Sequence, residues 1–271
     1  MKRKLALIGK DISYSLSPLI HGEIFREMGY DATYELFSVD KDELPALVKK
    51  LKSEYVGFNI TKPHKQNILP YLDDTDLKSV NTVRVDGDKL HGYSTDGYGF
   101  SRDLKIRFGE KIHGTALVLG AGGVARVIVD ELKKLGFDVY IRNRTAARAE
   151  ALADEFGAHV ADESVKPDLV VNCTSYGFNR GENPALAFDE QSGHDHWVFN
   201  DGRLKWMYDT IYSPPVTDFL ASFPSAERAN GLGMLILQAI EADRIMCGFD
   251  IDDALEKKLY ADIMRKIKSR I

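Results

Sequence analysis

Residues 115–125 have the sequence TALVLGAGGVA, in which an apolar run is followed by glycines and by the start of a helical pattern. The apolar run, residues 115–119, is typical of a strand buried in a parallel sheet. After the glycines, apolar residues recur on one face of a helix, at Val124, Val127, Ile128, Leu132 and Leu135. A glycine-rich turn between a strand and a helix is the context that supports dinucleotide binding. These residues therefore predict a Rossmann-type domain.

Each small residue of this turn has a physical role in holding a dinucleotide. The first glycine, Gly120, permits the tight turn, and Gly122 lets the backbone approach a pyrophosphate. Ala125 permits close packing of helix against strand, so that the helix N-terminus faces the phosphates. We expect cofactor contacts from Gly120, Ala121, Gly122, Gly123, Val124 and Ala125.

The end of the next strand predicts which dinucleotide binds. A site selective for NAD has a carboxylate there, about 20 residues after the glycines, which binds the ribose hydroxyls. This chain has Asn143, Arg144 and Thr145 instead, and Arg148 lies one helical turn further on. The two guanidinium groups can share a 2′-phosphate, and Thr145 can add a hydroxyl donor and cap the helix. We therefore expect NADP as the cofactor; the alternative is that Arg148 only lies on a solvated helix surface.

Strands and helices alternate along the rest of the chain, as in an α/β protein. Strands are expected near residues 5–9, 32–39, 55–61, 137–141 and 168–173, with a hairpin over 82–93 and short strands ending near 209 and 230. Helices are expected over 17–28, 43–51, 146–156, 232–246 and 252–267, with two more starting at Pro63 and near Asp96. Ser17 is the expected N-cap of the first helix, and the helix from Pro63 would carry Lys65.

The fold class that follows is α/β with two domains and a cleft between them. Residues 1–99 with about 236–271 would form a substrate-binding and catalytic domain with a mostly parallel sheet. Residues 100–235 would form the Rossmann-type domain that binds NADP. Two domains on either side of a cleft also predict hinge closure when ligands bind.

The composition excludes several classes of protein. Of the 271 residues, 44% are hydrophobic and 28% are charged, which is ordinary for a globular protein. The formal net charge of −5 argues against a non-specific nucleic-acid binder, which needs a basic surface. Cys173 and Cys247 are too few for a disulfide framework, and we expect them to be buried thiols in a reducing compartment. No signal peptide or membrane span is apparent in the sequence, so a cytoplasmic location is expected.

Small polar residues gather in the first third of the chain, where strands meet helices. Ser15 and Ser17 precede a helix, residues 59–65 (NITKPHK) follow the third strand, Asn81 begins the hairpin and Asp96 follows it. In an open α/β sheet, ligands bind at the carboxyl ends of the strands. Hydroxyls, amides, one lysine and one aspartate suit a polyhydroxylated ring that carries a carboxylate. The histidines of this region have no spacing that suggests a metal site.

These blocks of residues resemble the shikimate dehydrogenase family, nearly from end to end of the chain. The matching motifs in the first third are S-x-S-P at 15–18, N-[VI]-T-x-P-x-K at 59–65, V-N-T at 80–82, and Gly92, Thr95, Asp96 and Gly99 of G-x-N-T-D-x-x-G. The later ones are the NADP motifs at 119–125 and 143–145, N-C-T-S at 172–175 for N-A-T-[PS], D-x-x-Y-x-P at 209–214 and G-x-x-M-L-x-x-Q at 231–238. So many ordered matches are far more specific than any one motif.

The resemblance implies a reversible, NADPH-dependent reduction of 3-dehydroshikimate to shikimate, in aromatic amino-acid biosynthesis. Lys65 and Asp96 would be the catalytic pair. A lysine near the ring ketone can donate the proton or stabilise the developing alkoxide, and Asp96 would position that lysine and bond a neighbouring hydroxyl. For the pair alone, the alternative is a buried salt bridge in which Asp96 caps a helix.

The resemblance also implies the remaining contacts and partners. Substrate contacts are implied for Ser15, Ser17, Thr61, Lys65, Asn81, Asp96, Tyr212 and Gln238. Further cofactor contacts are implied for Thr174, Ser175 and Gly233. Structural roles are the alternatives, with the serines as helix caps, Tyr212 packed beneath a loop and Gln238 facing solvent. The expected partner is a small-molecule substrate, with no metal, nucleic acid or membrane, and the chain is expected to be a monomer or a homodimer.

The sequence departs from the family pattern at three places. Ser94 stands where the family has Asn before Thr-Asp, Leu77-Lys78-Ser79 replaces I-G-A, and Phe178 replaces a typical Met. Ser94 could alter how Asp96 is held, and Phe178 could change the shape of the nicotinamide pocket. Because no catalytic group is lost, the departures leave open a paralogue that acts on quinate or on an aminated shikimate analogue.

Two other functions agree less well with the sequence. A different two-domain NADP dehydrogenase, such as a methylenetetrahydrofolate dehydrogenase, is disfavoured by the paired serines and by the set of Asn59, Lys65, Asn81 and Asp96. A non-catalytic protein that senses NADP is disfavoured by the intact lysine–aspartate pair, which such a protein could lose.

Overall fold

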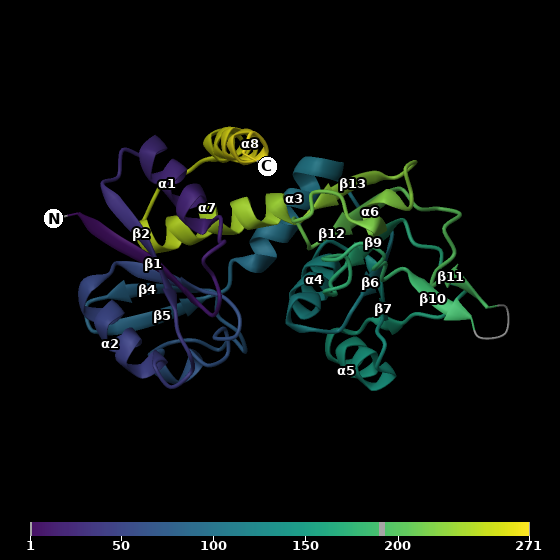
Figure 1. Cartoon of the computed structure of the whole chain (residues 1–271), viewed down its shortest axis with the longest axis horizontal. Coiled ribbons are helices and arrows are strands. Elements are labelled where there is room, and N and C mark those ends of the chain that lie inside the picture. Colours follow the sequence, from purple (N-terminus) through teal and green to yellow (C-terminus); the bar gives the residue numbers. More distant parts are fainter. Residues whose placement is uncertain (1, 190–192, 271) are drawn as a thin grey trace. The chain divides into compact units, whose positions relative to one another are not determined.

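The computed structural model describes residues 2–189 and 193–270 and divides the chain into two compact units. Unit 1 comprises Met1–Gly99 and Leu235–Ile271, and unit 2 comprises Phe100–Met234. In Figure 1, the purple and blue N-terminal segment and the yellow C-terminal helices belong to unit 1. The two-domain α/β fold class is confirmed.

Unit 1 is built on a five-stranded sheet in the order β2-β1-β3-β4-β5. Its strands are β1 (Arg3–Gly9), β2 (Ala32–Ser38), β3 (Gly57–Ile60), β4 (Thr82–Asp86) and β5 (Lys89–Tyr93). The pairs β1–β2 and β1–β3 are parallel, and β4 is antiparallel to both β3 and β5. The expected hairpin is confirmed, with its turn at Gly87 and Asp88. The turn requires a glycine because Gly87 has a φ of 58°.

Helices cover both faces of this sheet (Figure 1). They are α1 (Ser17–Glu27), α2 (Leu44–Glu54), the 3-10 helix η1 (Leu69–Tyr71), the start of α3 (Asp96–Phe108), most of α7 (Leu232–Cys247) and α8 (Asp253–Lys268). Successive side chains of a strand point to opposite faces. In β1, Ala6 and Ile8 therefore pack with α2, whereas Leu5 packs with Phe25 of α1 and Ala242 of α7.

The prediction of a helix starting at Pro63 is wrong. Residues 62–68 form successive turns, and the short η1 follows them. Its backbone makes local turn bonds and a bond to a distant segment: His64 N–H donates to the carbonyl of Thr61 at 2.9 Å, and the carbonyl of Lys65 accepts from Val80 N–H at 2.9 Å. The second bond ties the segment to the start of β4, so Lys65 lies on a turn and not on a helix.

The expected N-cap of α1 is also corrected. Leu16 occupies the N-cap position and Ser17 is the first residue of the helix. The backbone N–H of Ser17 donates to the hydroxyl oxygen of Ser15 at 3.2 Å, so Ser15 satisfies a donor that the helix start leaves open.

The two cysteines are free thiols, but they are half-buried and not fully buried as expected. Cys173 packs against the core of unit 2, and Cys247 against the part of unit 1 between α1 and α7. Burial raises the pKa of both thiols, which keeps them in the unreactive protonated form.

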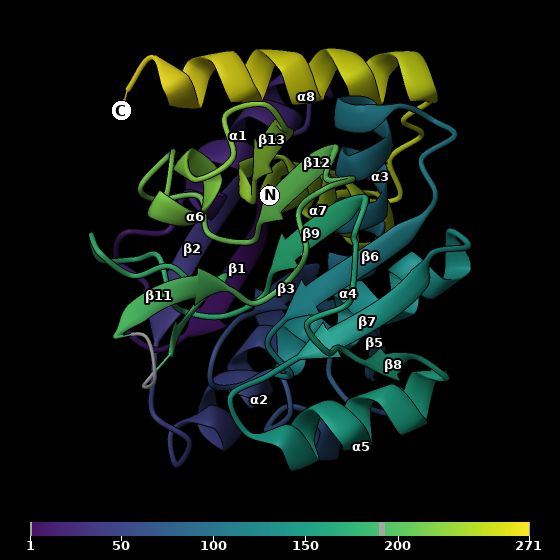
Figure 2. The ribbon, with the colours of Figure 1, turned by 90° about the vertical axis from the view of Figure 1, so that its right-hand side faces the viewer.

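Unit 2 contains a six-stranded sheet in which every pair is parallel, in the order β13-β12-β9-β6-β7-β8 (Figure 2). Its strands are β6 (Thr115–Leu119), β7 (Asp138–Arg142), β8 (His159–Val160), β9 (Leu169–Asn172), β12 (Trp206–Asp209) and β13 (Glu227–Asn230). The expected Rossmann-type arrangement is thereby confirmed, and β6 reproduces the apolar run of residues 115–119 without a shift.

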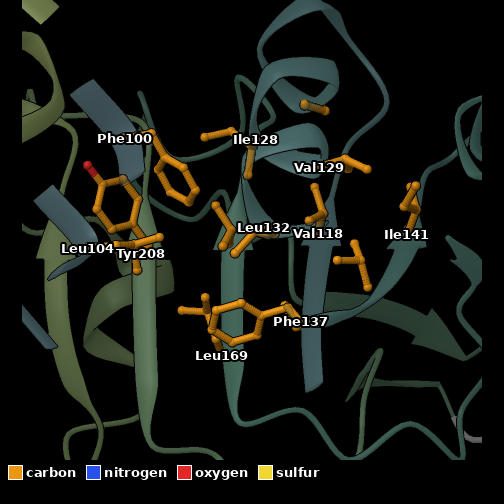
Figure 3. Close-up of a cluster of buried hydrophobic side chains, with 14 of the residues drawn as sticks. Phe100, Leu104, Val118, Ile128, Val129, Leu132, Phe137, Ile141, Leu169 and Tyr208 are labelled. Carbon is orange, nitrogen blue, oxygen red and sulfur yellow. The ribbon is translucent and has the colours of Figure 1, made fainter. Parts of the chain in front are cut away.

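The core of unit 2 lies on both faces of this sheet. Its helices are α4 (Gly123–Lys134), α5 (Ala146–Phe156), α6 (Asp218–Ala221), most of α3 and the start of α7. On one face Val118 of β6 packs with Ile128 and Val129 of α4, as Figure 3 shows. On the other face Leu117 packs with Phe219 of α6.

Four elements of unit 2 were not predicted. They are β8, the four-residue α6, and an antiparallel pair formed by β10 (Leu186–Asp189) and β11 (His194–Trp197). Each is too short for an apolar periodicity to stand out from its surroundings. Among residues 2–189 and 193–270, no helix is long and apolar enough to cross a bilayer.

Candidate active site

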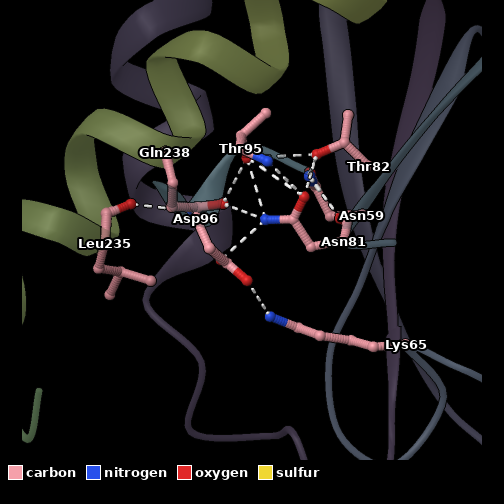
Figure 4. Close-up of polar contacts among 8 residues, drawn as sticks. All are labelled: Asn59, Lys65, Asn81, Thr82, Thr95, Asp96, Leu235 and Gln238. Carbon is pink, nitrogen blue, oxygen red and sulfur yellow. Dashed lines mark hydrogen bonds and ion pairs between the residues drawn. The ribbon is translucent and has the colours of Figure 1, made fainter. Parts of the chain in front are cut away.

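A lysine and an aspartate form the centre of the candidate site in unit 1 (Figure 4). Lys65 Nζ donates to Asp96 Oδ2 at 2.5 Å, and Asn81 Nδ2 donates to Asp96 Oδ1 at 2.8 Å. Both carboxylate oxygens are therefore bonded, which fixes the rotamer of Asp96. The side chains of Lys65 and Asp96 are 27% and 19% exposed, so the pair remains accessible to a small molecule.

These residues meet because of the strand directions in the five-stranded sheet. β3 and β5 run the same way, and Lys65 and Asp96 follow their carboxyl ends on the turn segment and at the start of α3. β4 runs the opposite way, so Asn81 just before its first residue lies at the same edge. The structure thus brings Lys65, Asn81 and Asp96 together at the edge where the sequence predicts a site, and their binding of a ligand stays a prediction.

The side-chain amide of Asn81 is held in one orientation by its neighbours. Its oxygen accepts from the backbone N–H of Thr95 at 2.9 Å, and its nitrogen donates to Thr95 Oγ1 at 3.0 Å. The backbone carbonyl of Asn81 accepts from Asn59 Nδ2 at 3.2 Å. Sequence reasoning did not include Asn59 or Thr95 among the site residues, although both lie in the motifs that drew attention to this region.

Gln238 belongs to the same cluster. Its side-chain oxygen accepts from Thr95 Oγ1 at 3.3 Å and lies 3.4 Å from Asn81 Nδ2, and its nitrogen donates to the carbonyl of Leu235 at 2.9 Å. Gln238 is half-buried, so it does not simply face solvent. Helix α7 therefore carries one predicted substrate residue to the site from a distant part of the chain.

The paired serines lie at the N-terminus of α1. Ser15 Oγ donates to Ser17 Oγ at 3.1 Å, and Ser17 is buried. Nearby, the hydroxyl of Tyr34 donates to Asn59 Oδ1 at 2.8 Å. A series of hydrogen bonds thus runs from Tyr34 through Asn59 to Asn81.

Thr61 is the first residue after β3, and its backbone N–H donates to the carbonyl of Ile8 at 2.8 Å. This bond places Thr61 beside the end of β1, at the same edge of the sheet as Lys65.

A buried histidine–aspartate pair lies behind this network and was not predicted. His21 Nδ1 is 2.9 Å from both carboxylate oxygens of Asp243, and both side chains are almost fully buried. Burial raises the pKa of Asp243, and His21 opposes that shift. The imidazole also stacks on Tyr34, with ring centroids 4.0 Å apart. The pair thereby connects α1 with α7, the helices that carry Ser17 and Gln238. The sequence carries no signal for this pair, because its two members are separated by 222 positions.

In unit 2, the glycine turn lies where the sequence predicts it, between β6 and α4. Gly120 has a φ of 109°, and its N–H donates to the carbonyl of Arg142 at 2.8 Å. A Cβ on Gly120 would lie 3.0 Å from Thr174 Cγ2, so the turn fits closely against the loop after β9.

Open N–H groups and free space at this turn suit a bound dinucleotide. Gly122 is the N-cap of α4 and supplies no capping side chain, so the first N–H groups of the helix can bind a phosphate. A Cβ placed on Gly122 or Gly123 would meet no atom within 4 Å, so this side of the turn has open space. The helix also contributes Ala125, which is fully buried as close helix–strand packing requires.

The candidate phosphate-binding residues surround the N-terminus of α5. Arg144 and Arg148 are exposed, and Asn143 Nδ2 donates to the carbonyl of Thr145 at 3.0 Å. Thr145 occupies the N-cap position as expected, but its hydroxyl makes no capping hydrogen bond, which corrects that part of the prediction. Arg144 Nη1 lies 3.4 Å from the hydroxyl of Tyr176, on the loop after β9.

Thr174 and Ser175 follow the end of β9. The side-chain oxygen of Asn172 accepts from both the backbone N–H and the hydroxyl of Thr174, at 2.9 and 2.7 Å. Ser175 is exposed, and Tyr212 is half-buried on the loop after β12. Tyr212 belongs to unit 2, whereas the other predicted substrate residues belong to unit 1.

Close packing within unit 2 accounts for the glycine at position 233. It lies in the first turn of α7, where a Cβ would come within 2.0 Å of Asp103 Oδ1. Asp103 is fully buried on α3 and accepts a hydrogen bond from the hydroxyl of Tyr208 at 2.8 Å. The glycine is therefore required for the close approach of two helices within unit 2, independently of any contact with a cofactor.

Replacing Gly233 with alanine is expected to lower the free energy of unfolding by about 1–3 kcal/mol, because the added methyl must displace the buried Asp103 carboxylate. Chemical denaturation measures this change. The matched control is Gly22→Ala in α1, where a Cβ meets nothing within 4 Å and alanine is expected to stabilise by about 0.5–1 kcal/mol. A Gly233→Ala protein of wild-type stability that binds NADP poorly would instead make Gly233 a cofactor contact alone.

Comparison with known proteins gives a consistent result along the whole chain. Residues 7–83 match the family described as the shikimate dehydrogenase substrate binding domain, and residues 104–170 match the family described as shikimate / quinate 5-dehydrogenase. An NADP(+)-dependent shikimate dehydrogenase of Caldicellulosiruptor saccharolyticus is 35% identical, with 99% of this chain and 100% of the relative covered.

Crystal structures show the same likeness. The shikimate 5-dehydrogenase of Thermus thermophilus, in complex with NADP(H) and shikimate, superposes with a TM-score of 0.83 at 29% identity, covering 96% of this chain and 99% of the other. The ligand-free 5-ketofructose reductase of a Gluconobacter strain superposes with a TM-score of 0.79 at 28% identity, covering 97% of this chain and 99% of the other. Proteins of this architecture therefore include a reductase named for a different sugar-like ketone.

Proposed function

This chain belongs to the shikimate dehydrogenase family, and we propose that Lys65 and Asp96 are its catalytic residues in the reversible, NADP(H)-dependent reduction of 3-dehydroshikimate to shikimate. The reaction is a step of aromatic amino-acid biosynthesis. The observation that carries the proposal is the 2.5 Å hydrogen bond from Lys65 to Asp96, whose second oxygen is occupied by Asn81.

The reduction requires the protein to deliver one proton, to the ketone oxygen. NADPH, when bound, supplies the hydride that becomes the new C–H bond at the ketone carbon. The ketone oxygen must gain a proton in the same step, and the Lys65 ammonium can donate it or stabilise the alkoxide. Asp96 keeps the ammonium in place and leaves a lone pair for a neighbouring substrate hydroxyl. In the reverse direction Lys65 takes the proton back.

Unit 1 is proposed to bind the substrate. The hydroxyls of Ser15 and Ser17, together with the N-terminus of α1, suit a carboxylate, because donors and the positive end of the helix dipole coincide there. Thr61, Asn81 and Gln238 offer donors and acceptors for ring hydroxyls. Tyr212 is proposed as a further substrate contact.

Unit 2 is proposed to bind NADP. The glycine turn would hold the pyrophosphate and the arginines near α5 the 2′-phosphate. The proposed cofactor contacts are Gly120, Ala121, Gly122, Gly123, Val124, Ala125, Asn143, Arg144, Thr145, Arg148, Thr174, Ser175 and Gly233. The free thiols of Cys173 and Cys247 are compatible with the reducing cytoplasm, where we propose that the enzyme works.

A related polyhydroxylated ketone or quinate is the second candidate substrate. Two departures from the family pattern support this second candidate. Ser94 directly precedes the Thr95-Asp96 pair, and Phe178, which is 60% exposed, lies on the loop after β9. The similarity to a 5-ketofructose reductase points to the same class of alternative.

One assay separates these substrates. Purified protein is mixed with shikimate or quinate, each with NADP or NAD, and the absorbance of reduced nicotinamide is followed. We expect kcat/KM for shikimate with NADP to exceed that of every other combination by about tenfold or more. Preferred turnover of quinate would move the protein to a paralogous branch. If no combination is turned over although NADP binds, the proposed reaction is wrong.

Sedimentation of the same sample measures whether the protein is a monomer or a homodimer, as we propose.

A further inference from the structure

The carboxylate of Asp209 lies fully buried at the carboxyl end of β12, in unit 2. Its Oδ1 accepts from Asn172 Nδ2 at 2.9 Å and from the backbone N–H of Ile211 at 3.0 Å. Its Oδ2 accepts from the hydroxyl of Thr217 at 2.6 Å. The same Thr217 hydroxyl caps α6 by accepting from Leu220 N–H at 3.3 Å. All of these partners are neutral donors to a charged acceptor.

Asn172 transmits this arrangement to the next loop. It is the last residue of β9 and lies directly opposite Asp209 in the parallel register. Its nitrogen also donates to the carbonyl of Tyr176 at 3.0 Å, while its oxygen accepts both bonds from Thr174. The side-chain amide of Asn172 thus hydrogen-bonds both the loop that begins at Cys173 and the carboxylate of Asp209.

This loop forms one wall of the glycine turn. A Cβ on Gly120 would lie 3.0 Å from Thr174 Cγ2 and 3.2 Å from the carbonyl oxygen of Cys173. A shift of Thr174 by a few tenths of an ångström would therefore change the space beside Gly120, where the dinucleotide is proposed to bind.

We propose that Asp209 is a positioning residue for the dinucleotide site: its ionised carboxylate orients Asn172, which holds the loop carrying Thr174 and Ser175 in the conformation that binds NADP. The inference rests on the proposed function of unit 2, and it assigns to Asp209 no contact with the cofactor.

The charge on Asp209 is stabilised by hydrogen bonds from neutral groups. Burial raises its pKa to about 6, and the hydrogen bonds from Thr217, Ile211 and Asn172 oppose that rise. The Cys173 thiol interacts with Asp209 electrostatically, and neutral donors bond both of its oxygens. In the part of the chain that the structure describes, no cationic side chain bonds to this carboxylate.

The sign of the effect follows from the direction of this shift. Because the folded-state pKa lies above the ordinary value of 3.8, ionisation of Asp209 opposes folding above about pH 6 and costs less as the pH falls toward 4. A protonated carboxyl, however, presents a hydrogen where an acceptor is required. Protonation is therefore expected to stabilise the fold while loosening the bonds that orient Asn172.

The test uses the full chain and four proteins: wild type, Asp209→Asn, Thr217→Val and the control Asp218→Asn. Affinity for NADP is measured by calorimetry at pH 8. The pH profile from 5 to 8 is measured with NAD, because the 2′-phosphate of NADP is a monoester that itself titrates near pH 6. Thermal unfolding at pH 7 is recorded for each protein.

We expect Asp209→Asn to weaken NADP binding about three- to tenfold, the range of one lost hydrogen bond, without lowering Tm. Wild type should lose NAD affinity with a midpoint near pH 6, and Asp209→Asn should show no such step. Thr217→Val removes a bond that lowers the pKa of Asp209, so its midpoint should move to higher pH. Asp218→Asn should match wild type in every measurement.

Wild-type affinity and an unchanged pH profile in Asp209→Asn would overturn the inference, as would a loss of affinity that only follows a loss of Tm. If wild type turns over shikimate while Asp209→Asn binds normally, the positioning role fails and the proposed function stands. If wild type binds NADP and shows the expected pH profile with NAD but turns over no substrate, the proposed function fails and the positioning role stands. A wild-type protein that binds neither dinucleotide overturns both.

Discussion

Replacing Lys65 with methionine is expected to lower kcat for shikimate oxidation by about 10²–10⁴-fold, the usual contribution of a positioned general acid or base. Methionine has nearly the length of lysine and carries neither its charge nor its proton. The 2.5 Å bond to Asp96 is lost, but Asn81 still holds the other carboxylate oxygen, so the site keeps its shape. The affinity for NADP is expected to be almost unchanged, because Lys65 belongs to unit 1 and the glycine turn to unit 2.

The matched control is Lys62→Met, on the same turn segment. Lys62 is exposed, and its backbone carbonyl accepts a hydrogen bond from Lys10 N–H. The side chain can therefore be changed without disturbing that bond. Steady-state kinetics with shikimate and NADP compare the two variants with wild type, and calorimetry measures NADP binding. If Lys65→Met retains a tenth or more of the wild-type kcat, Lys65 is not the proton donor and the Lys65–Asp96 pair is only a salt bridge.

Replacing Arg144 and Arg148 together with glutamine is expected to lower kcat/KM for NADP about 10²-fold and to change that for NAD far less. Each charge-assisted hydrogen bond to a phosphate contributes about 1.5 kcal/mol at the lower end of its range, which applies because both arginines are exposed. Two such bonds give about 3 kcal/mol, and each 1.4 kcal/mol is tenfold. Glutamine preserves the helix-forming tendency of position 148.

The control for this pair is Lys133→Gln with Lys134→Gln, at the C-terminal end of α4. It removes the same amount of charge from unit 2 at the opposite end of that helix from the glycine turn. Initial rates with NADP and NAD are compared for both double variants. Equal losses with the two cofactors would remove the argument that the arginines bind a 2′-phosphate, and a loss in the lysine variant would show a general effect of charge.

The residues of the glycine turn and of the sheet edge could be predicted because local sequence carries their signal. The apolar run of β6 is buried whatever else happens, and Gly120 stands where only a positive φ permits the turn. Likewise, polar residues that follow strands must lie at one edge of a sheet whose strands run the same way. Lys65 and Asp96 follow strands in this way, and the structure brings them together with Asn81, which precedes the antiparallel β4.

The conformation around Lys65 could not be predicted from the same local signals. Pro63 is a common first residue of a helix, and that propensity led to the wrong element. The bond between Lys65 O and Val80 N–H decides the turn, and its two partners are separated by an intervening segment whose path is set by the hairpin. Propensity is a weak prior when a bond of this kind competes with it.

Pairs of buried polar residues that are far apart in the sequence were also invisible beforehand. His21 and Asp243 are separated by 222 positions, and Asp103 meets Gly233 only because two helices pack closely. Neither contact leaves a periodicity or a spacing in the sequence. Buried polar groups must find partners, but the sequence does not say which partner each one finds.

By itself, the sequence determined the α/β class and the Rossmann-type half and predicted NADP as the cofactor, because strand period, glycine conformation and the chemistry of charged side chains act over a few residues. The catalytic roles of Lys65 and Asp96 came from the resemblance of whole motifs to the family and stay a proposal. Only the tertiary structure decided that Lys65 stands on a turn, that Gln238 reaches the first sheet, and that Asp209 is a buried anion among neutral donors. These properties depend on which distant segments pack together, and burial of a charge changes its energy only once that packing exists.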